Sequence, residues 1–558
     1  MPQSLIPRLV FAASLLATLA HAEPAPRARQ APAPAQKVGK LAEGKWLLPT
    51  GQTISPAGRL INLAGIRPQA LTLSPNGKFL AVAGSSKDVL IFDASTGQEL
   101  SRTTMPADMK AAEAPKPGAA PVSAPAPEKT PGIGDKKDEP VPETGDPKPD
   151  KDGKMSFAGL AFSPDGTRLF VSSRGGQIRH FGVDSAGKLK AVGSFTLPNA
   201  NAPKRKEDIA TGIALSADGS KLYACASLGN RLQEFDAATG KPLRQWNTGI
   251  APLNVLLAGT KAYVSCLAGP RPKTGDLTAG VGRGVLGLVD DRSIASAGSV
   301  VIIDLAGDKV LAELETGLHC GALALSPKGD YVVAANAGSD TLSVIATATD
   351  TIVEKIWARA TPADPFGAQP CALAFDPSGK ILYVANGTQN AVAVVKFDPK
   401  DKESRVLGLI PTAWFPAGLA FDAARKTILV SSIRGIGSAK IPKPTDKPGA
   451  SSKDFWGTVA IIPAPDAPAL AAHTRVALDG MRYARFAAAA LPARPGTAPR
   501  PVPERAGEPS VFKHVIYVIK ENRSYDQVLG DMKEGNGDKT LCTFGEKITP
   551  NQDRKSVV

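Results

Sequence analysis

The sequence is poor in aromatic residues and in cysteine, and each shortage excludes a class of protein. Aromatic side chains make up 5% of the 558 residues, and the five cysteines show no C-x-x-C spacing. The sequence therefore predicts neither a disulfide framework nor a structural zinc site. The one pairing left open joins Cys320 to Cys371, although their offsets from the nearest turn favour opposite strand faces.

Positive charge exceeds negative charge, but it is not concentrated in one place. The formal net charge is +14, and the lysines and arginines are dispersed or lie in proline-rich tracts. The sequence has no basic helix and no platform of aromatic and basic residues. It therefore does not indicate a nucleic-acid partner.

Long apolar runs are also scarce, and the one near the N-terminus indicates export. Leu9–Ala20 is apolar, follows Arg8 and ends at a small-x-small cleavage site over residues 20–22. This run is too short to span a bilayer and has the length of the apolar part of a signal peptide. We predict a signal peptide over residues 1–22 with cleavage after Ala22, and a periplasmic or secreted protein. A short membrane anchor is the alternative, and no other segment predicts a transmembrane span.

By contrast, proline and glycine are abundant, and they mark turns and linkers. The chain has 49 Pro and 54 Gly. Residues 23–49 begin with a proline-rich tract and predict a disordered leader. Residues 106–150 hold eleven Pro and predict a disordered insertion. A second insertion, about 268–297, is rich in glycine and charge, and is either a functional loop or a plain surface loop.

One sequence pattern recurs along the chain: an apolar strand, a Ser/Asp-Pro-x-Gly turn and a second apolar strand. The turn residues suit a tight reversal in which glycine takes a positive φ, and the flanking segments have the β-branched, partly alternating pattern of hairpin strands. The clearest copies are LTLSPNGKFLAVAG, LAFSPDGTRLFVSS, IALSADGSKLYACA, LALSPKGDYVVAAN and LAFDPSGKILYVAN, which begin at Leu71, Leu160, Ile213, Leu323 and Leu373, and two weaker copies begin at Asn254 and Leu419.

Third and fourth strands complete each unit. Val89–Gly97 and Val300–Gly307 are third strands that contain an Asp near their end, and Thr351–Ile356 is a fourth, outer strand. Four antiparallel strands with a period of about 45 residues are typical of propeller blades. One blade cannot bury both faces, whereas a closed ring does. The sequence predicts an all-β, seven-bladed β-propeller over residues 50–480, with Arg59–Leu63 completing the ring beside the last blade.

Two of the copies resemble a known family. Ser326–Ile356 and Asp376–Asp398 are similar to the repeats of YVTN-family β-propellers. The resemblance covers residues 50–480 and implies the fold, but these propellers serve as scaffolds, as binding modules and occasionally as enzymes. It leaves open a non-catalytic scaffold that binds a protein or ligand partner on the propeller face.

A lactonase-like propeller enzyme is a further alternative, with its site at the central channel. His180 and His319 are the candidate catalytic residues, although each also fits an ordinary loop or core histidine. No carboxylates or histidines cluster at equivalent positions of the copies, which argues against this alternative.

The composition changes beyond the repeats. Residues 481–510 are rich in proline, alanine and arginine and predict an extended linker. His514–Ile519 (HVIYVI) is then a continuous apolar run, typical of a strand buried on both faces of an α/β sheet. Glu521 and Asn522 follow this strand, where open α/β sheets place their active sites. Ser524–Gln527 matches an S-x-x-Q capping box and predicts a helix start.

Residues 521–526 (ENRSYD) resemble the N-terminal motif of the phosphoesterase family that includes bacterial phospholipases C and acid phosphatases, related in fold to alkaline phosphatase. The resemblance implies that residues 511–558 are the N-terminal fragment of such a domain, with Glu521 and Asn522 as ligands of a divalent metal ion. Carboxylate and amide oxygens are hard ligands suited to such an ion, which would polarise a phosphoester substrate. The alternative is that the motif only caps a helix.

This second resemblance stops near residue 552. Gln552–Val558 depart from the family pattern, so we expect truncation or a frame shift there, with the hydroxyl nucleophile and the remaining metal ligands beyond the end. The predicted function is an exported β-propeller with a metal-dependent phosphoesterase that hydrolyses phosphate esters. The present chain is expected to be inactive in that reaction.

Overall fold

The computed structural model divides the chain into two units, residues 38–522 and residues 1–37 with 523–558. The residues that the structure describes are 38–84, 86, 88–104, 155–360, 364–437, 455–517, 519, 523–533, 535 and 537–549. The predicted signal peptide, the insertion 106–150 and Gln552–Val558 lie outside these residues, and they stay predictions.

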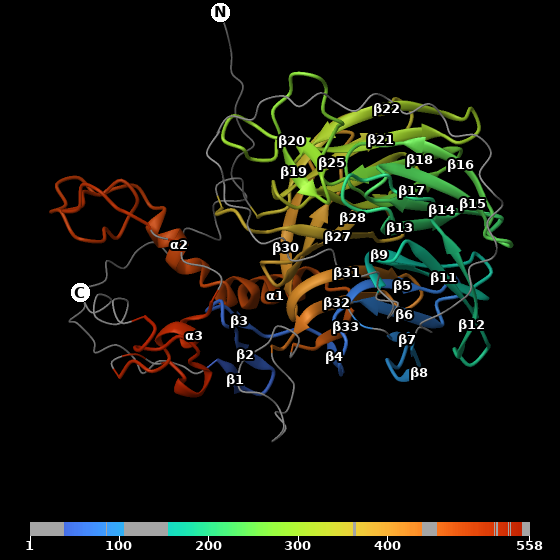
Figure 1. Ribbon diagram of the computed structural model, residues 1–558. Helices are drawn as coiled ribbons and strands as arrows, with labels where there is room; N and C mark the ends of the chain where they lie inside the picture. The colour runs from blue at the N-terminus through green and yellow to red at the C-terminus, as the bar shows by residue number, and fades with distance from the viewer. Residues whose placement is uncertain are drawn as a thin grey trace, which may run out of the picture. The chain divides into compact units, whose positions relative to one another are not determined.

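Seven four-stranded antiparallel sheets make up a β-propeller in the first unit (Figure 1). Blades one and two consist of β5 (Pro68–Leu73), β6 (Phe79–Gly84), β7 (Asp88–Asp93) and β8 (Glu99–Thr104), and of β9 (Met155–Phe162), β10 (Arg168–Ser173), β11 (Gln177–Val183) and β12 (Leu189–Thr196). Blades three and four consist of β13 (Ala210–Leu215), β14 (Lys221–Ala226), β15 (Arg231–Asp236) and β16 (Pro242–Asn247), and of β17 (Pro252–Ala258), β18 (Lys261–Cys266), β21 (Gly298–Asp304) and β22 (Lys309–Thr316). Blades five and six consist of β23 (Cys320–Leu325), β24 (Tyr331–Asn336), β25 (Thr341–Ala346) and β26 (Thr351–Trp357), and of β27 (Pro370–Phe375), β28 (Ile381–Asn386), β29 (Ala391–Lys396) and β30 (Arg405–Pro411). Blade seven consists of β31 (Trp414–Asp422), β32 (Thr427–Gly435), β33 (Gly457–Pro463) and β4 (Arg59–Leu63).

The ring is closed by its innermost strands and by one strand from the N-terminal part of the chain. The innermost strands β5, β9, β13, β17, β23, β27 and β31 contact one another in a closed circuit. The outer strand of blade seven is β4, which pairs antiparallel with β33 so that Ile61 lies opposite Val459. The seven predicted units and the closing role of Arg59–Leu63 are therefore both confirmed.

The recurring turn is held by a side-chain hydrogen bond to the backbone. The Ser163 hydroxyl oxygen accepts from the N–H of Arg168 at 2.9 Å, and the Asp376 carboxylate accepts from the N–H of Ile381 at 3.1 Å. The turn glycines take a positive φ, which L side chains rarely adopt. They are Gly77, Gly166, Gly219, Gly329 and Gly379, with φ between 68° and 78°.

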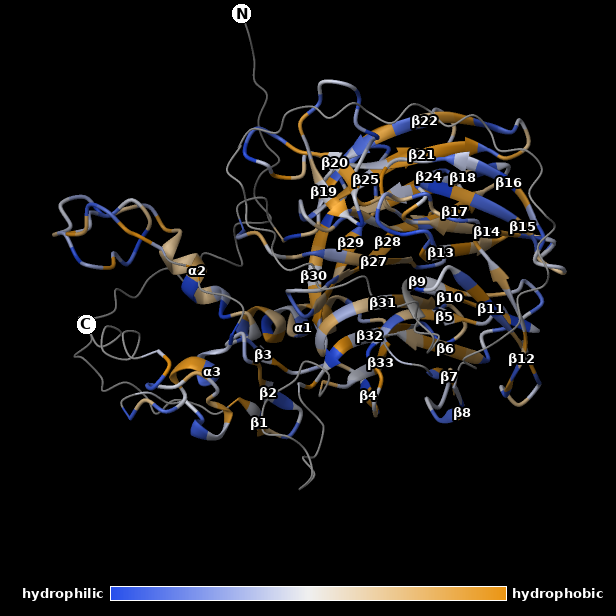
Figure 2. Ribbon diagram, viewed as in Figure 1, coloured by the Kyte–Doolittle hydropathy of each residue, from blue (hydrophilic) through white to orange (hydrophobic). Residues whose placement is uncertain are grey.

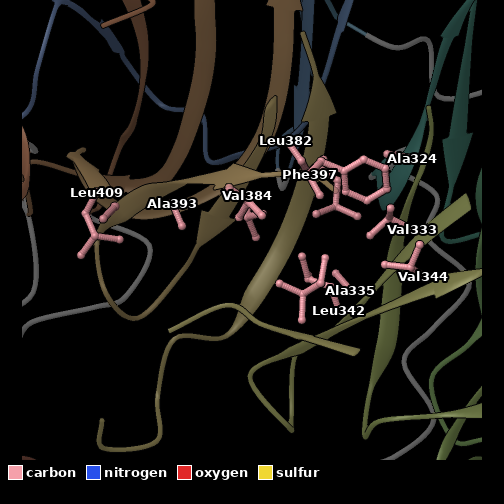
Figure 3. Packing of buried hydrophobic residues seen from close by; sticks show 14 of the residues in the cluster. Ala324, Val333, Ala335, Leu342, Val344, Leu382, Val384, Ala393, Phe397 and Leu409 are labelled. Atoms are coloured by element: carbon pink, nitrogen blue, oxygen red, sulfur yellow. The ribbon is translucent and has the colours of Figure 1, made fainter. Parts of the chain in front are cut away.

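The hydrophobic core lies in layers between neighbouring blades. Figure 2 shows hydrophobic residues on many strands of the sheets. Figure 3 shows one layer, where side chains of β24 and β25 face those of β28 and β29. Ala335, Leu342 and Leu382 have no exposed surface there. Full burial of a leucine contributes about 2 kcal/mol, so these contacts between blades stabilise the ring.

A small N-terminal sheet precedes the ring in the same unit. It contains β1 (Gly39–Ala42), β2 (Lys45–Leu47) and β3 (Thr53–Ile54). Leu48 and Ile54 pack with Trp414 of blade seven. Residues 38–49 are therefore folded, whereas the sequence predicted a leader without structure. The partner that buries these apolar residues lies far away in sequence, so local composition did not reveal it.

Two helices follow the ring, α1 (Ala467–Gly480) and α2 (Tyr483–Ala489). α1 packs along β30, where the Thr474 hydroxyl oxygen accepts from the N–H of Leu409 at 2.9 Å. A Cβ at Gly408 would lie 2.5 Å from that oxygen, so the close approach requires glycine. The linker predicted over residues 481–510 thus begins with a helix and is irregular afterwards.

The strand predicted over His514–Ile519 does not form among the described residues of that run. Val515, Ile516 and Tyr517 are 83%, 90% and 85% exposed. A lone strand has no neighbour to satisfy its backbone or cover its faces, so an apolar run alone does not make one. The second unit contains the short helix α3 (Tyr525–Leu529) and the 3₁₀ turn η3 (Lys539–Leu541).

Candidate functional site

One mouth of the central channel collects loops from several blades. Each innermost strand begins at this end, and the loop joining the second and third strands of a blade lies there too, because neighbouring strands run antiparallel. The insertion 268–297 is such a loop and contains the hairpin β19 (Thr278–Gly282) and β20 (Val285–Leu288). The carbonyl oxygen of Arg283 accepts from the N–H of Lys204 at 3.1 Å, which ties the insertion to the entry of blade three.

A polar bracket recurs at this mouth in three blades. A side-chain oxygen of one blade accepts from a backbone N–H at the entry of the next blade. The pairs are Asn230 with Ala251 at 2.9 Å, Asp340 with Gln369 at 2.9 Å and Asn390 with Phe415 at 3.0 Å. All six residues have a positive φ, between 51° and 64°. The brackets fix the backbone around the channel mouth and leave the side chains at the entries free to differ.

His319 stands at the entry of blade five, beside this mouth. It directly precedes β23, has a φ of 54° and is exposed. Its carbonyl oxygen accepts from the N–H of Ala337 at 3.2 Å, and a Cβ at Gly338 would lie 2.9 Å from its Nδ1. The imidazole therefore packs on Gly338 and is open to water. Of the two histidines predicted for a lactonase-like site, this one lies at the channel mouth.

His180 lies elsewhere, in the core of blade two. It belongs to β11, is 7% exposed and packs against Phe170 and Phe195, with ring centroids 5.6 Å and 5.1 Å away. Burial, aided by the charge of Arg168, lowers the pKa of His180 below its ordinary value. His180 therefore fits the core role that the sequence left open, and the structure does not bring it together with His319.

A buried ion pair supports the entry of blade three. Asp208 is 1% exposed and accepts from the N–H groups of Leu228 and Gly229 at 3.0 Å and 3.2 Å. An Arg231 guanidinium nitrogen lies 3.3 Å from its carboxylate. Burial raises the pKa of Asp208 and lowers the pKa of Arg231. Because the partners of Asp208 are backbone groups and one arginine, the pair positions loops.

The sequence analysis missed the brackets, although the sequence carries a signal for them. Asn230, Asp340 and Asn390 each stand fourteen residues after the Ser or Asp that opens the turn of their repeat. An Asn or Asp at a fixed offset within a repeat indicates a shared structural role. Its hydrogen-bond partner lies in the next repeat and could not be read from one copy alone.

Glu521 and Asn522, the predicted metal ligands, lie outside the described residues. The residues after them are described, and Ser524 caps α3 there. Its hydroxyl accepts from the N–H of Gln527 at 3.3 Å, and the Gln527 side chain accepts from the N–H of Ser524 at 3.1 Å. The capping box predicted at Ser524–Gln527 is confirmed, and this half of the motif is a helix start.

The parts of the chain that the structure describes contain no group of three or more His, Cys, Asp or Glu placed to hold a metal ion. All five cysteines are unpaired, so the bridge between Cys320 and Cys371 is not formed. No described helix has the length and apolarity to cross a membrane.

A family model described as a seven-bladed β-propeller lactonase matches residues 291–413. No curated protein matches the chain significantly. Solved structures similar to the chain include the RRP9 WD40 repeats (11% identity, 73% of this chain and 97% of that one, TM-score 0.48) and Kuenenia stuttgartiensis hydrazine synthase (14%, 69% and 98%, 0.46). A third is the structure of U3-55K (11%, 72% and 98%, 0.47).

The family match covers the end of blade four and the whole of blades five and six. It agrees with the seven four-stranded sheets and with the closed circuit of innermost strands. On these observations, the chain is a β-propeller protein.

Proposed function

We propose that the ring binds a small molecule at the mouth formed by its strand entries and acts there as a lactonase-like hydrolase of cyclic esters. The family match carries this proposal, because residues 291–413 contain His319 and the bracket between Asp340 and Gln369. The sequence alone favoured a different main function, and this alternative now has the better support.

Opening a lactone requires a group that activates water and donors that receive the negative charge developing on the carbonyl oxygen. His319 is the base in this proposal, because its imidazole is exposed at the mouth and rests on Gly338. The brackets hold the neighbouring entries in fixed conformations, as precise placement of reacting groups requires.

The test is hydrolysis of a panel of sugar and acyl lactones near neutral pH. We expect His319→Gln to reduce kcat/KM by about 100-fold, the usual contribution of a general base. His514→Gln changes an exposed histidine outside the ring and should leave the rate unchanged. Full activity of His319→Gln would contradict the site. Failure of the folded wild type on every lactone would instead favour the non-catalytic scaffold.

A second candidate concerns the C-terminal motif, where we propose that Glu521 and Asn522 bind a divalent metal ion of a phosphoesterase. The capped helix α3 directly after these residues supports the proposal. A protein that completes this domain should hydrolyse p-nitrophenyl phosphate with Mg²⁺, Mn²⁺ or Zn²⁺. The double variant Glu521→Ala, Asn522→Ala should lose both this turnover and the metal retained after gel filtration. Unchanged metal content and turnover would refute the assignment.

A further inference from the structure

A cavity of about 670 Å³ lies beside the outer strand of blade six and the helices α1 and α2, and His319 is not among its lining residues. Neither of the two elements that form most of its wall belongs to the repeat. One is the connection from β26 to β27, and the other is the pair of helices after the ring, visible beside β30 in Figure 1. All of its lining residues belong to the first unit.

The connection from β26 to β27 is longer than the connections at the other two brackets, β16 to β17 and β30 to β31. The backbone carbonyl oxygen of a bracket residue accepts from an N–H just after the outer strand of its own blade. Its side-chain oxygen accepts from a second N–H, at the start of the next blade. These two positions are three residues apart at Thr248 and Ala251, and also at Thr412 and Phe415. They are eleven apart at Ala358 and Gln369. The bracket at Asp340 keeps its geometry, and among the described residues of the longer connection Ala360 and residues 364–367 line the cavity.

An exposed aromatic ring is held in place on this connection. Phe366 is 73% exposed, yet the Arg359 guanidinium lies 4.4 Å from its ring centroid and 4.6 Å from that of Trp357. Arg359 is itself 3% exposed. One face of Phe366 is therefore fixed by a buried cation, and the ring offers a flat apolar surface to the cavity that it lines.

Two arginines on the opposite wall supply positive charge. Arg482, with a φ of 56°, joins α1 to α2, and Arg485 is one turn further along α2. A Cβ at Gly51 would lie 3.7 Å from both terminal nitrogens of Arg482, so this guanidinium rests on bare backbone. Within the described residues neither arginine has a carboxylate partner.

The remaining walls limit what the cavity can accept. Leu409, Leu478 and Met481 make part of it apolar. Asp364 is the acidic residue among those that line the cavity, and its carboxylate accepts from the Tyr483 hydroxyl at 2.7 Å, which raises the pKa of Tyr483 to about 12. The ligand must therefore combine an apolar body with a negative charge.

We propose that this cavity binds a small organic anion with a flat apolar body, such as an aromatic carboxylate or sulfonate. The body stacks on Phe366 and contacts the apolar wall, while the anionic group meets Arg482 and Arg485. This site is independent of lactone hydrolysis at the channel mouth and of the C-terminal motif, so it stands if either of those proposals fails.

The test uses two fluorescent probes that differ in charge. 1-Anilinonaphthalene-8-sulfonate carries a sulfonate, and N-phenyl-1-naphthylamine is its uncharged counterpart. We expect the double variant Arg482→Ala, Arg485→Ala to weaken binding of the sulfonate by about tenfold, as two exposed ion pairs would, and to leave the uncharged probe unaffected. Phe366→Ala should weaken binding of both probes.

Matched controls make the outcome decisive. Arg475→Ala removes an exposed arginine of α1 that does not line the cavity, and it should change neither affinity. Ile516→Ser alters the most exposed apolar side chain outside the cavity. Sulfonate binding that survives loss of both arginines, or disappears in Ile516→Ser alone, would overturn the proposal.

Discussion

Asn230 has a φ of 51°, and its side-chain oxygen accepts from the N–H of Ala251, the entry residue of the next blade. Most residues avoid this left-handed region, whereas asparagine tolerates it. One residue thus turns the chain inside blade three and fixes the start of blade four. Asp340 and Asn390 do the same for blades six and seven.

Replacing Asn230 should separate these two roles. Asn230→Gly removes the acceptor but accepts the positive φ, and we expect it to lower the free energy of unfolding by about 1 kcal/mol, because the half-buried N–H of Ala251 loses its partner. Asn230→Ala adds backbone strain and should cost about 1 kcal/mol more. Asn230→Asp keeps the acceptor and should be the mildest change. Equal stability of the glycine variant and the wild type in urea unfolding would refute the bracket.

His180 should make stability depend on pH. Because burial lowers its pKa in the folded state, the unfolded chain takes up a proton more readily near pH 6.5. The contribution of neutral His180 is therefore complete above that pH and is lost as the pH falls toward the folded-state pKa. His180→Met fills similar space without titrating, and urea unfolding from pH 7.5 to 5 should give a flatter profile. An unchanged profile would contradict this role.

The turn bonds could be predicted from sequence and the brackets could not, for one physical reason. Ser163 bonds to Arg168 within a single turn, so the pattern of turn residues contains the whole interaction. Asn390 bonds to Phe415 in another blade, and nothing in the local sequence shows that the ring brings them together. His180 and His319 looked alike in the sequence because the burial of a side chain also depends on contacts with other strands, which the local sequence does not show.

At the scale of the elements, β4 is a short strand that completes a blade far from it in sequence. It is five residues long, and without it blade seven would lack its outer strand. Leu63, the last residue of β4, is 1% exposed and packs with Leu80 and Leu429 of blades one and seven. The closure therefore depends on side-chain burial as well as on backbone pairing.

We expect Leu63→Ala to lower the free energy of unfolding by about 2–4 kcal/mol, the usual cost of removing a fully buried leucine side chain. Asn62→Ala changes an exposed neighbour on the same strand and should shift stability by less than about 0.5 kcal/mol. Calorimetry of the two variants checks the prediction. A similar melting temperature for both would show that β4 does not contribute to ring closure.

The strands of the ring were predictable because each repeats a pattern, whereas the flanking elements occur once. The sheet β1–β3 is anchored by Trp414, and α1 is anchored by Leu409 and Gly408 of β30. These contacts span long sequence separations. For His514–Ile519 the strand pattern is present in the sequence, but no strand forms among the described residues of that run. Here the local pattern predicted an element for which no neighbouring strand is described.

At the scale of the whole molecule, the ring buries many apolar side chains between its blades, whereas the apolar run that follows the linker is exposed. The run after the linker holds Val515, Ile516 and Tyr517 almost fully in water. We therefore expect the 558-residue chain to hydrolyse no p-nitrophenyl phosphate with any of Mg²⁺, Mn²⁺ or Zn²⁺, because Glu521 and Asn522 follow a run without a sheet. Metal-dependent release of p-nitrophenol above the buffer rate would contradict this.

The ring should also unfold independently of that segment. The chain separates into two units by its internal contacts, and the apolar run of residues 514–519 is exposed among its described members. Gly530 is the one buried residue among the described residues of 514–558, so removing this segment should change the melting temperature by less than about 2 °C. The same removal takes away six exposed large apolar side chains of the described residues, so aggregation on heating should decrease. A melting temperature lower by several degrees would mean that the segment packs on the ring and contributes to its stability. Light scattering during the same calorimetric scan distinguishes this result from a change in solubility alone.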